Sequence, residues 1–152
     1  MGVRLKLNPL KDVISGKRLV VVDDSIVRGN TSRKVVQMLY SAGAKEIHMR
    51  ISSPPLLYPC YYGIDMATKK EFVANHRTLE DIRKYLNVDS LRYISIDGLV
   101  KAIGESKDKF CFACFNGDYP VPVSKDLHFD KYFMESDEYR RGEKTAEPAK
   151  QR

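Results

Sequence analysis

The chain has 152 residues, of which 43% are hydrophobic and 30% charged, a composition typical of a globular protein with one sizeable core. No apolar run approaches the roughly 18 residues of a membrane span, and the N-terminus lacks the apolar stretch of a signal peptide. The net charge of +6 is scattered, and aromatic and basic residues do not interleave, so neither membrane nor nucleic-acid binding is favoured. Three cysteines without a secretory signal indicate a reducing, cytoplasmic compartment and metal or redox use.

The first half of the chain predicts a strand, helix and strand unit. Residues 3–7 alternate apolar and basic side chains, which predicts a short strand that Asn8 and Pro9 end. The β-branched run Leu19–Val22 predicts a strand buried on both faces. A helix over about residues 31–42, stopped by Gly43, and a strand over 47–51 follow. A βαβ unit of this kind predicts parallel pairing.

The second half is less regular and ends in a charged tail. We predict helices over residues 68–75 and 78–85, a strand over 91–96 and a helix over 97–103. Thr78 is a favoured helix-capping residue. Beyond Pro122 the apolar density falls, and residues 135–152 are predicted to be a disordered tail.

Two adjacent carboxylates, Asp23 and Asp24, stand where the strand Leu19–Val22 stops. Ligands of open α/β sheets bind beyond the carboxyl ends of the strands, so this position predicts a site. The loop that follows contains Gly29 and leads into a helix, whose first N–H groups can bind an anion. Carboxylates suit sugar hydroxyls or Mg²⁺, so the combination suggests a phosphorylated ribose.

A response-regulator receiver domain also begins with an acidic pair after a buried strand. It would need a phospho-acceptor Asp at the end of a later buried strand and a Lys at the end of another. Asp65 follows a poor strand, and no Lys is suitably placed. The receiver interpretation is therefore not favoured.

The cysteines form a Cys-x-x-Cys pair, Cys111 and Cys114, with Cys60 far upstream in a proline-rich loop. Thiolates at this spacing can bind one metal centre together with ligands from elsewhere. Zinc held by the three cysteines and one of His48, His76 or His128 is one possibility. Buried structural cysteines are another.

The stretch from Val20 to Thr31, Val-Val-Val-Asp-Asp-Ser-Ile-Val-Arg-Gly-Asn-Thr, resembles the phosphoribosyl pyrophosphate motif of type I phosphoribosyltransferases. Its Arg-Gly-Asn-Thr ending is similar to that of the glutamine phosphoribosylpyrophosphate amidotransferases (amidophosphoribosyltransferases). The similarity continues through residues 50–65 and returns at Cys111–Pro120. It covers about residues 1–120 and matches the C-terminal part of that family.

The resemblance implies an α/β fold, a type I phosphoribosyltransferase-like (Rossmann-like) parallel sheet with flanking helices, incomplete in this chain. Residues 1–104 would be the C-terminal part of the phosphoribosyltransferase domain, and residues 105–134 an irregular segment that carries cysteines. The implied substrate is phosphoribosyl pyrophosphate, and Mg²⁺ is held with the help of Asp23 and Asp24. The implied binding residues are Asp23, Asp24, Ser25, Val27, Arg28, Gly29, Asn30 and Thr31.

The resemblance also implies a [4Fe–4S] cluster on Cys60, Cys111 and Cys114, with a fourth cysteine outside this chain. The implied activity is the first step of purine nucleotide synthesis, in which glutamine and phosphoribosyl pyrophosphate give phosphoribosylamine, glutamate and pyrophosphate. In the family, the glutaminase and the pyrophosphate-binding loop lie upstream of these residues. We therefore expect a fragment that is inactive alone and that needs N-terminal glutaminase and transferase segments, in a homo-oligomer. The alternative is a non-catalytic regulatory module that binds phosphoribosyl pyrophosphate.

Overall fold

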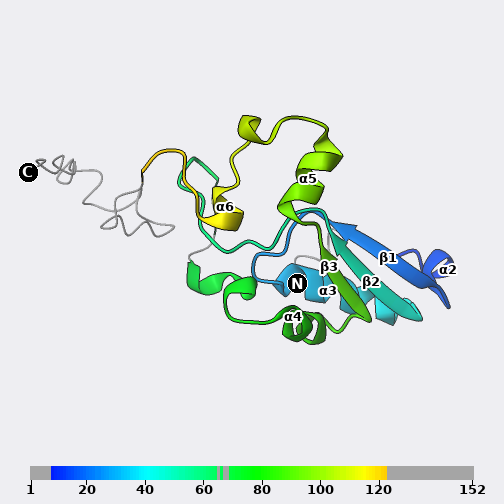
Figure 1. Ribbon diagram of the computed structural model, residues 1–152. Coiled ribbons are helices and arrows are strands. Elements are labelled where there is room, and N and C mark those ends of the chain that lie inside the picture. The colour runs from blue at the N-terminus through cyan, green and yellow to red at the C-terminus, as the bar shows by residue number, and fades with distance from the viewer. Residues whose placement is uncertain (1–7, 65, 67–68, 123–152) are drawn as a thin grey trace, which may run out of the picture.

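The computed structural model describes residues 8–64, 66 and 69–122. Its centre is a parallel sheet of three strands in the order β1-β2-β3, formed by Arg18–Asp23, Glu46–Ile51 and Ser90–Tyr93. The strands therefore follow one another in space as they do in sequence (Figure 1). This is the parallel α/β architecture that the strand and helix pattern predicted. The predicted strand over residues 3–7 and the predicted tail over 135–152 lie outside the described residues.

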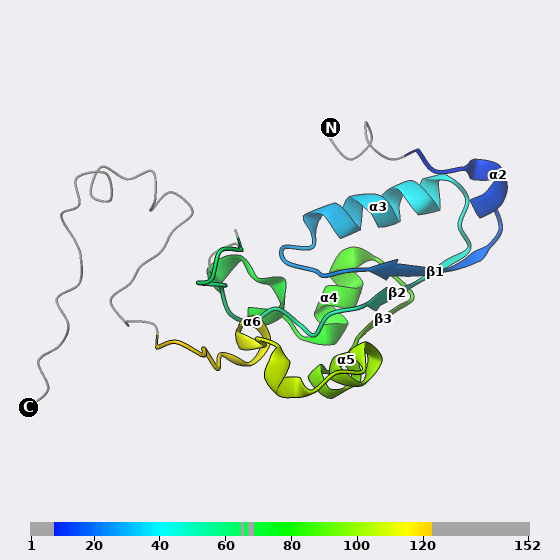
Figure 2. The same ribbon diagram turned by 90° about the horizontal axis from the view of Figure 1, so that it is seen from above.

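Two helices, α3 (Asn30–Ser41) and α4 (Leu79–Leu86), cover one face of this sheet, while α5 (Ile96–Ile103) lies on its other side (Figures 1 and 2). Alternate residues of β2 point into the core between sheet and helices, and Val36 of α3 and Leu86 of α4 are fully buried against them. The core consists of Ile26, Val36, Ile47, Met49, Ile51, Val73, Ile82, Leu86, Val88 and Leu91.

Short elements occupy the rest of the described chain. They are the helix α2 (Lys11–Ile14), the 3-10 helices Lys69–Glu71, Val73–Asn75 and Lys107–Lys109, and the helix α6 (Ala113–Asn116). No helix within the described residues is long and apolar enough to cross a lipid bilayer.

The prediction that β1 is buried on both faces was wrong. Val20 and Val22 are 67% and 71% exposed, whereas Val21 packs against the core. Within the described residues β1 pairs only with β2, and α3 and α4 cover only the face to which Val21 belongs. The residues of β1 are apolar on both faces, as the sequence indicated, but no segment among the described residues covers Val20 and Val22 on the second face.

Two other predicted elements differ from the structure. The predicted helix over residues 68–75 is two 3-10 turns separated by Phe72, whose extended backbone directs a fully buried ring into the interior. The predicted strand over 91–96 ends at Tyr93, because Ser95 accepts a hydrogen bond from the Gly98 N–H and caps α5. The capping role predicted for Thr78 is confirmed by its reciprocal bonds with Asp81.

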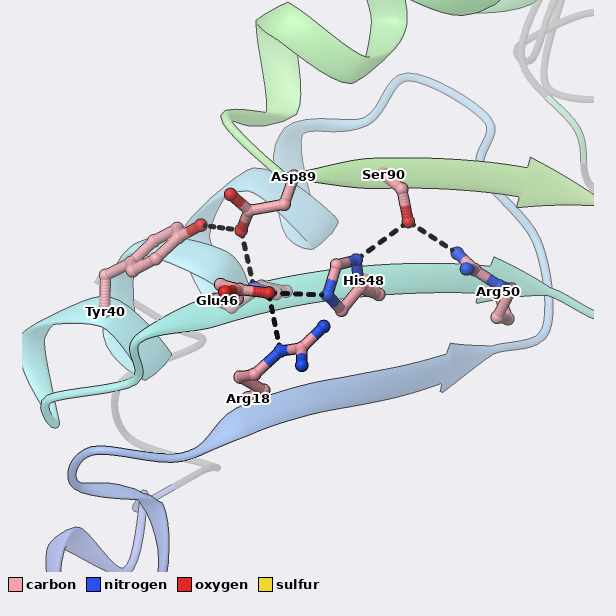
Figure 3. Close-up of polar contacts among 8 residues, drawn as sticks. Arg18, Tyr40, Glu46, His48, Arg50, Asp89 and Ser90 are labelled. Carbon is pink, nitrogen blue, oxygen red and sulfur yellow. Dashed lines mark hydrogen bonds and ion pairs between the residues drawn. The ribbon is translucent and has the colours of Figure 1, made fainter.

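The face of the sheet away from α3 and α4 carries a polar network across all three strands (Figure 3). Glu46 accepts from Arg18 at 2.7 Å and contacts His48 at 3.1 Å, and the other ring nitrogen of His48 lies 2.9 Å from the Ser90 hydroxyl. Arg50 also donates to that hydroxyl. The Arg18 guanidinium lowers the pKa of Glu46. These cross-strand pairs satisfy the polar side chains that this face presents.

At the amino end of the sheet, Asp89 joins α3 to β2 and β3. One of its carboxylate oxygens accepts from the Tyr40 hydroxyl and from the Ile47 N–H, both at 2.7 Å (Figure 3). The Ile47 N–H and, next, the Tyr40 hydroxyl lower the pKa of Asp89 below its usual value of 3.8. Burial and this carboxylate raise the pKa of Tyr40 to about 12.

We predict that Asp89→Ala lowers the free energy of unfolding by about 1–3 kcal/mol, because the buried Ile47 N–H loses its acceptor. Because its pKa is lower in the folded state, ionised Asp89 stabilises the fold above about pH 4, and this contribution is lost as the pH falls further. Urea unfolding at several pH values measures both effects. Asp89→Asn is the matched control, since it keeps an acceptor oxygen and loses only the pH dependence. Equal losses in both variants at neutral pH would contradict the assignment.

Candidate functional site: the carboxyl edge of the sheet

The last residues of the three strands lie side by side at one edge of the sheet. Asp23 is in register with Ile51, and Ile51 with Tyr93. The main chain continues this alignment beyond the strands, because the Ser52 N–H and hydroxyl both donate to the Asp23 carbonyl, at 3.0 and 3.1 Å. Asp23 and Asp24 therefore stand where open parallel sheets bind their ligands.

The two carboxylates organise the start of the loop that follows β1. Asp23 accepts from the Asp24 N–H at 3.1 Å and from the buried Ser32 hydroxyl of α3 at 3.4 Å. Asp24 is exposed, and one of its oxygens accepts from the N–H and hydroxyl of Ser25. Asp23 is thus held between strand and helix, while Asp24 faces solvent.

The loop reaches α3 through Gly29, which is buried and has φ +77°, a left-handed conformation that favours glycine. Within the described part of the chain, no side chain caps the first turn of α3. The first intrahelical bond runs from the Arg33 N–H to the Gly29 carbonyl at 2.9 Å. The N–H groups at the start of this twelve-residue helix therefore have no side-chain cap among the described residues, which is the geometry that an anion site requires.

The predicted loop residues have different partners. The Asn30 side-chain oxygen accepts from the Tyr85 hydroxyl at 2.8 Å, and the Val27 carbonyl accepts from the Val73 N–H at 2.8 Å. Arg28 is paired with Glu71 at 2.6 Å. The sequence leaves two roles for Arg28, supplying charge to a phosphate or facing solvent. Its side chain is half exposed, and its guanidinium is paired with the Glu71 carboxylate.

The three cysteines come from two segments that the structure binds together, residues 57–62 and 111–121. The Cys114 carbonyl accepts from the N–H groups of Leu57 and Tyr58, and the Tyr119 hydroxyl donates to the Pro59 carbonyl at 2.7 Å. The sulfur of Cys60 accepts from the Tyr62 N–H at 3.4 Å. Burial raises the pKa of the Cys114 thiol, and so do its neighbours Cys60 and Cys111.

Comparison with known proteins shows to which proteins the chain is related. The chain is 50% identical over 135 residues to the amidophosphoribosyltransferase of Synechococcus elongatus, covering 89% of this chain and 27% of the relative. It is 59% identical over 124 residues to that of Methanocaldococcus jannaschii, covering 82% of this chain and 26% of the relative. The chain is related to one part of the amidophosphoribosyltransferases.

A solved structure agrees. Glutamine phosphoribosylpyrophosphate amidotransferase from B. subtilis, determined with ADP and GMP, superposes with a TM-score of 0.72 at 47% identity, over 78% of this chain and 27% of that protein. The fold is therefore that of the type I phosphoribosyltransferase-like part of an amidophosphoribosyltransferase. The chain spans about a quarter of the length of these relatives. No protein-family model matches it.

The acidic pair suits the Mg²⁺ that amidophosphoribosyltransferases use with their substrate. The described residues bring no third His, Cys, Asp or Glu to form a complete metal site with Asp23 and Asp24. Mg²⁺ is commonly bound by one or two carboxylates, with waters and substrate phosphates completing its shell. A pair of carboxylates with no third such ligand among the described residues therefore fits Mg²⁺.

The histidines predicted as possible zinc ligands are engaged elsewhere. Both ring nitrogens of His48 have partners on the face of the sheet away from α3 and α4, which we call the open face. His76 contacts the Lys70 carbonyl at 3.1 Å. His128 lies outside the described residues. As they lie, the described residues contain no group of three His, Cys, Asp or Glu side chains arranged to hold one ion.

Tyr85 is the residue at this edge that sequence reasoning missed. It lies on α4, more than fifty positions from the loop that it contacts. The sequence placed it only at the end of a predicted helix. No local motif marks such a residue, because its role depends on how α4 docks beside α3.

Gly29 is expected to tolerate no side chain. A Cβ built there would lie 3.1 Å from Cε1 of Tyr85, in a conformation that L-residues rarely adopt. A side chain at Gly29 would thus be obstructed from the α4 side. We predict that Gly29→Ala lowers the free energy of unfolding by about 1–2 kcal/mol. Thermal unfolding measures this, with Gly104→Ala as control, because Gly104 also has positive φ but an added Cβ meets nothing within 4 Å. Equal losses in the two variants would leave backbone strain as the whole effect and refute the contribution of Tyr85.

Proposed function

We propose that this chain forms the ribose- and phosphate-binding part of an enzyme that transfers an amino group from glutamine to phosphoribosyl pyrophosphate. The products are phosphoribosylamine, glutamate and pyrophosphate, and the reaction opens purine nucleotide synthesis. The observation that carries the proposal is the adjacent pair Asp23 and Asp24 at the carboxyl edge of β1, followed by the uncapped start of α3. This chain is about 50% identical to an amidophosphoribosyltransferase over most of the length of the chain itself.

In this proposal the loop from Ser25 to Thr31 holds the 5′-phosphate. The N–H groups at the start of α3 point at the anion, and the hydroxyls of Ser25 and Thr31 add donors. Val27, Arg28, Gly29 and Asn30 contribute through their main chain, because the side chains of Arg28 and Asn30 are engaged with Glu71 and Tyr85. Anchoring the phosphate at this point fixes the position of the ribose relative to β1.

Asp23 and Asp24 accept hydrogen bonds from the ribose hydroxyls. Displacement of pyrophosphate builds positive charge on the ribose ring, and carboxylates held beside the ring stabilise that charge. Asp23 is fixed in place by Ser32 and by the Asp24 N–H, so it needs little reorganisation as the charge develops. Mg²⁺, when bound with the help of this pair, would neutralise charge on the departing pyrophosphate.

The proposal predicts Mg²⁺-dependent binding of phosphoribosyl pyrophosphate, measured by titration calorimetry on this chain. The double variant Asp23→Asn with Asp24→Asn should weaken it about a hundredfold, since two charge-assisted hydrogen bonds of roughly 1.5 kcal/mol each are lost. The matched control is Asp12→Asn with Asp97→Asn, the same charge change at two exposed positions outside residues 23–31. Equal affinities of the two double variants would refute the assignment of the acidic pair.

We further propose that Cys60, Cys111 and Cys114 bind a [4Fe–4S] cluster, with a fourth ligand from outside this chain. The hydrogen bonds between residues 57–59 and residues 114–119 already bring the three cysteines into one region. Cys60 and Cys111 lie near enough to Cys114 to raise the pKa of its thiol, after burial, and a cationic centre at this place would stabilise the thiolates. A single zinc ion would need the three thiolates around one point, whereas a cluster binds its thiolates on separate irons.

We predict that anaerobic reconstitution with iron, sulfide and an excess of a small thiol as fourth ligand gives about four irons per chain. Cys114→Ser should abolish iron binding, and His76→Ala should leave it unchanged. Iron and sulfide analysis with visible absorption measures the loading. One zinc per chain, lost in His76→Ala, would establish the zinc site instead.

Cytoplasmic location and a homo-oligomeric intact enzyme stay predictions. Nothing in the comparisons favours the alternative of a non-catalytic regulatory module. That module would share the ribose and phosphate contacts proposed above. It would differ in failing to form phosphoribosylamine from ammonium once the rest of the protein is present.

A further inference from the structure

Tyr85 of α4 contacts the phosphate-binding loop in two ways. Its hydroxyl donates to the Asn30 side-chain oxygen at 2.8 Å. Its ring lies against Gly29, so that an added Cβ would be 3.1 Å from ring atom Cε1. One side chain from a distant helix thus holds both the left-handed residue before α3 and the first residue of that helix.

The same ring collects two guanidinium groups. The guanidinium carbon of Arg77 lies 4.2 Å from the ring centroid, and that of Arg33, in the first turns of α3, lies 5.1 Å from it. Both distances are within the range of cation–π attraction. Among the described residues, neither Arg33 nor Arg77 forms an ion pair with a carboxylate. Arg28, in contrast, is paired with Glu71.

We propose that Tyr85 is a positioning residue for the phosphate-binding loop. Its hydroxyl and ring keep Gly29 and Asn30 in the conformation that leaves the first N–H groups of α3 open to an anion. It also keeps the guanidinium groups of Arg33 and Arg77 beside that loop, where they replace Arg28 as the source of positive charge. The proposal rests on the proposed function for its ligand, a sugar phosphate, but its effect on the loop is a property of the chain without ligand.

Tyr85 can have this role because few other contacts restrain the loop on the side that faces α4. The start of α3 has no side-chain cap, and Gly29 has a wide choice of backbone conformations. The Tyr85 hydroxyl does not bind an N–H group of the helix. It binds the Asn30 side chain, so it restrains the helix start without occupying the donors that an anion needs.

The variants Tyr85→Phe and Tyr85→Leu separate the two contacts. Tyr85→Phe removes only the hydroxyl, and Tyr85→Leu also removes the ring on which the arginines stack. The control is Tyr40→Phe, which removes a hydroxyl that donates to Asp89 at 2.7 Å near the other end of α3. The control therefore loses a similar hydrogen bond without touching the loop.

The ligand-free reporter is hydrogen exchange of the Arg33 amide, which donates to the Gly29 carbonyl. We expect exchange about fivefold faster in Tyr85→Phe, as for one lost net hydrogen bond, and faster again in Tyr85→Leu. In Tyr40→Phe the Arg33 amide should exchange as in the unchanged chain. Equal Arg33 exchange in the unchanged chain and in both Tyr85 variants would overturn the proposal, even if a variant proved less stable overall.

The second measurement is the affinity for ribose 5-phosphate at two salt concentrations. Tyr85→Leu should weaken binding about tenfold, and Arg77→Gln should weaken it less while reducing its salt dependence. If the chain without substitution binds ribose 5-phosphate well and Tyr85→Leu binds it equally well, the proposal is overturned. The proposed function stays intact in that case. If the unchanged chain binds no ribose 5-phosphate, the proposed function fails, and the Arg33 amide alone decides the role of Tyr85.

Discussion

The parallel register of the three strands is the constraint on which the rest of this structure depends. It places the ends of β1, β2 and β3 at one edge, and the bonds from Ser52 to the Asp23 carbonyl continue that alignment into the loops. A carboxylate pair at the end of an isolated strand would be two mutually repelling charges in water. At this edge Asp23 gains the Ser32 hydroxyl of α3 as a partner, and Asp24 faces the space beyond the strand. The sheet and α3 thus give the two carboxylates a fixed place at the end of β1.

The second organising feature is the junction between residues 57–62 and 111–121. Hydrogen bonds to the Cys114 carbonyl and from the Tyr119 hydroxyl join segments more than fifty residues apart. The rings of Tyr61 and Tyr62 lie beside that of Tyr119, with centroids 5.1 and 6.1 Å away. The region of the cysteines is therefore held by main-chain and aromatic contacts of the protein itself. A metal centre would add to an existing junction.

The open face of the sheet has a mixed character. Val20 and Val22 are exposed there, next to the network of Arg18, Glu46, His48, Ser90 and Arg50. Parallel sheets in α/β proteins are usually covered on both faces, and their strands are then apolar on both. The chain spans about a quarter of the length of the amidophosphoribosyltransferases that it resembles. Val20 and Val22 are exposed in a chain that matches only one part of those proteins.

The sequence by itself determined the features that depend on local patterns. The period of apolar residues was sufficient for the βαβ unit, and Thr78 with Asp81 for the start of α4. The end of the strand at the Asp23–Asp24 pair was also readable from the sequence, and the proposed site rests on it. Only the tertiary structure decided that Val20 and Val22 are exposed, that Arg28 is neutralised by Glu71, and that Tyr85 supports the loop. The reason is physical. Periodicity and capping act between residues within one or two turns of each other, whereas these outcomes depend on which distant segment packs alongside.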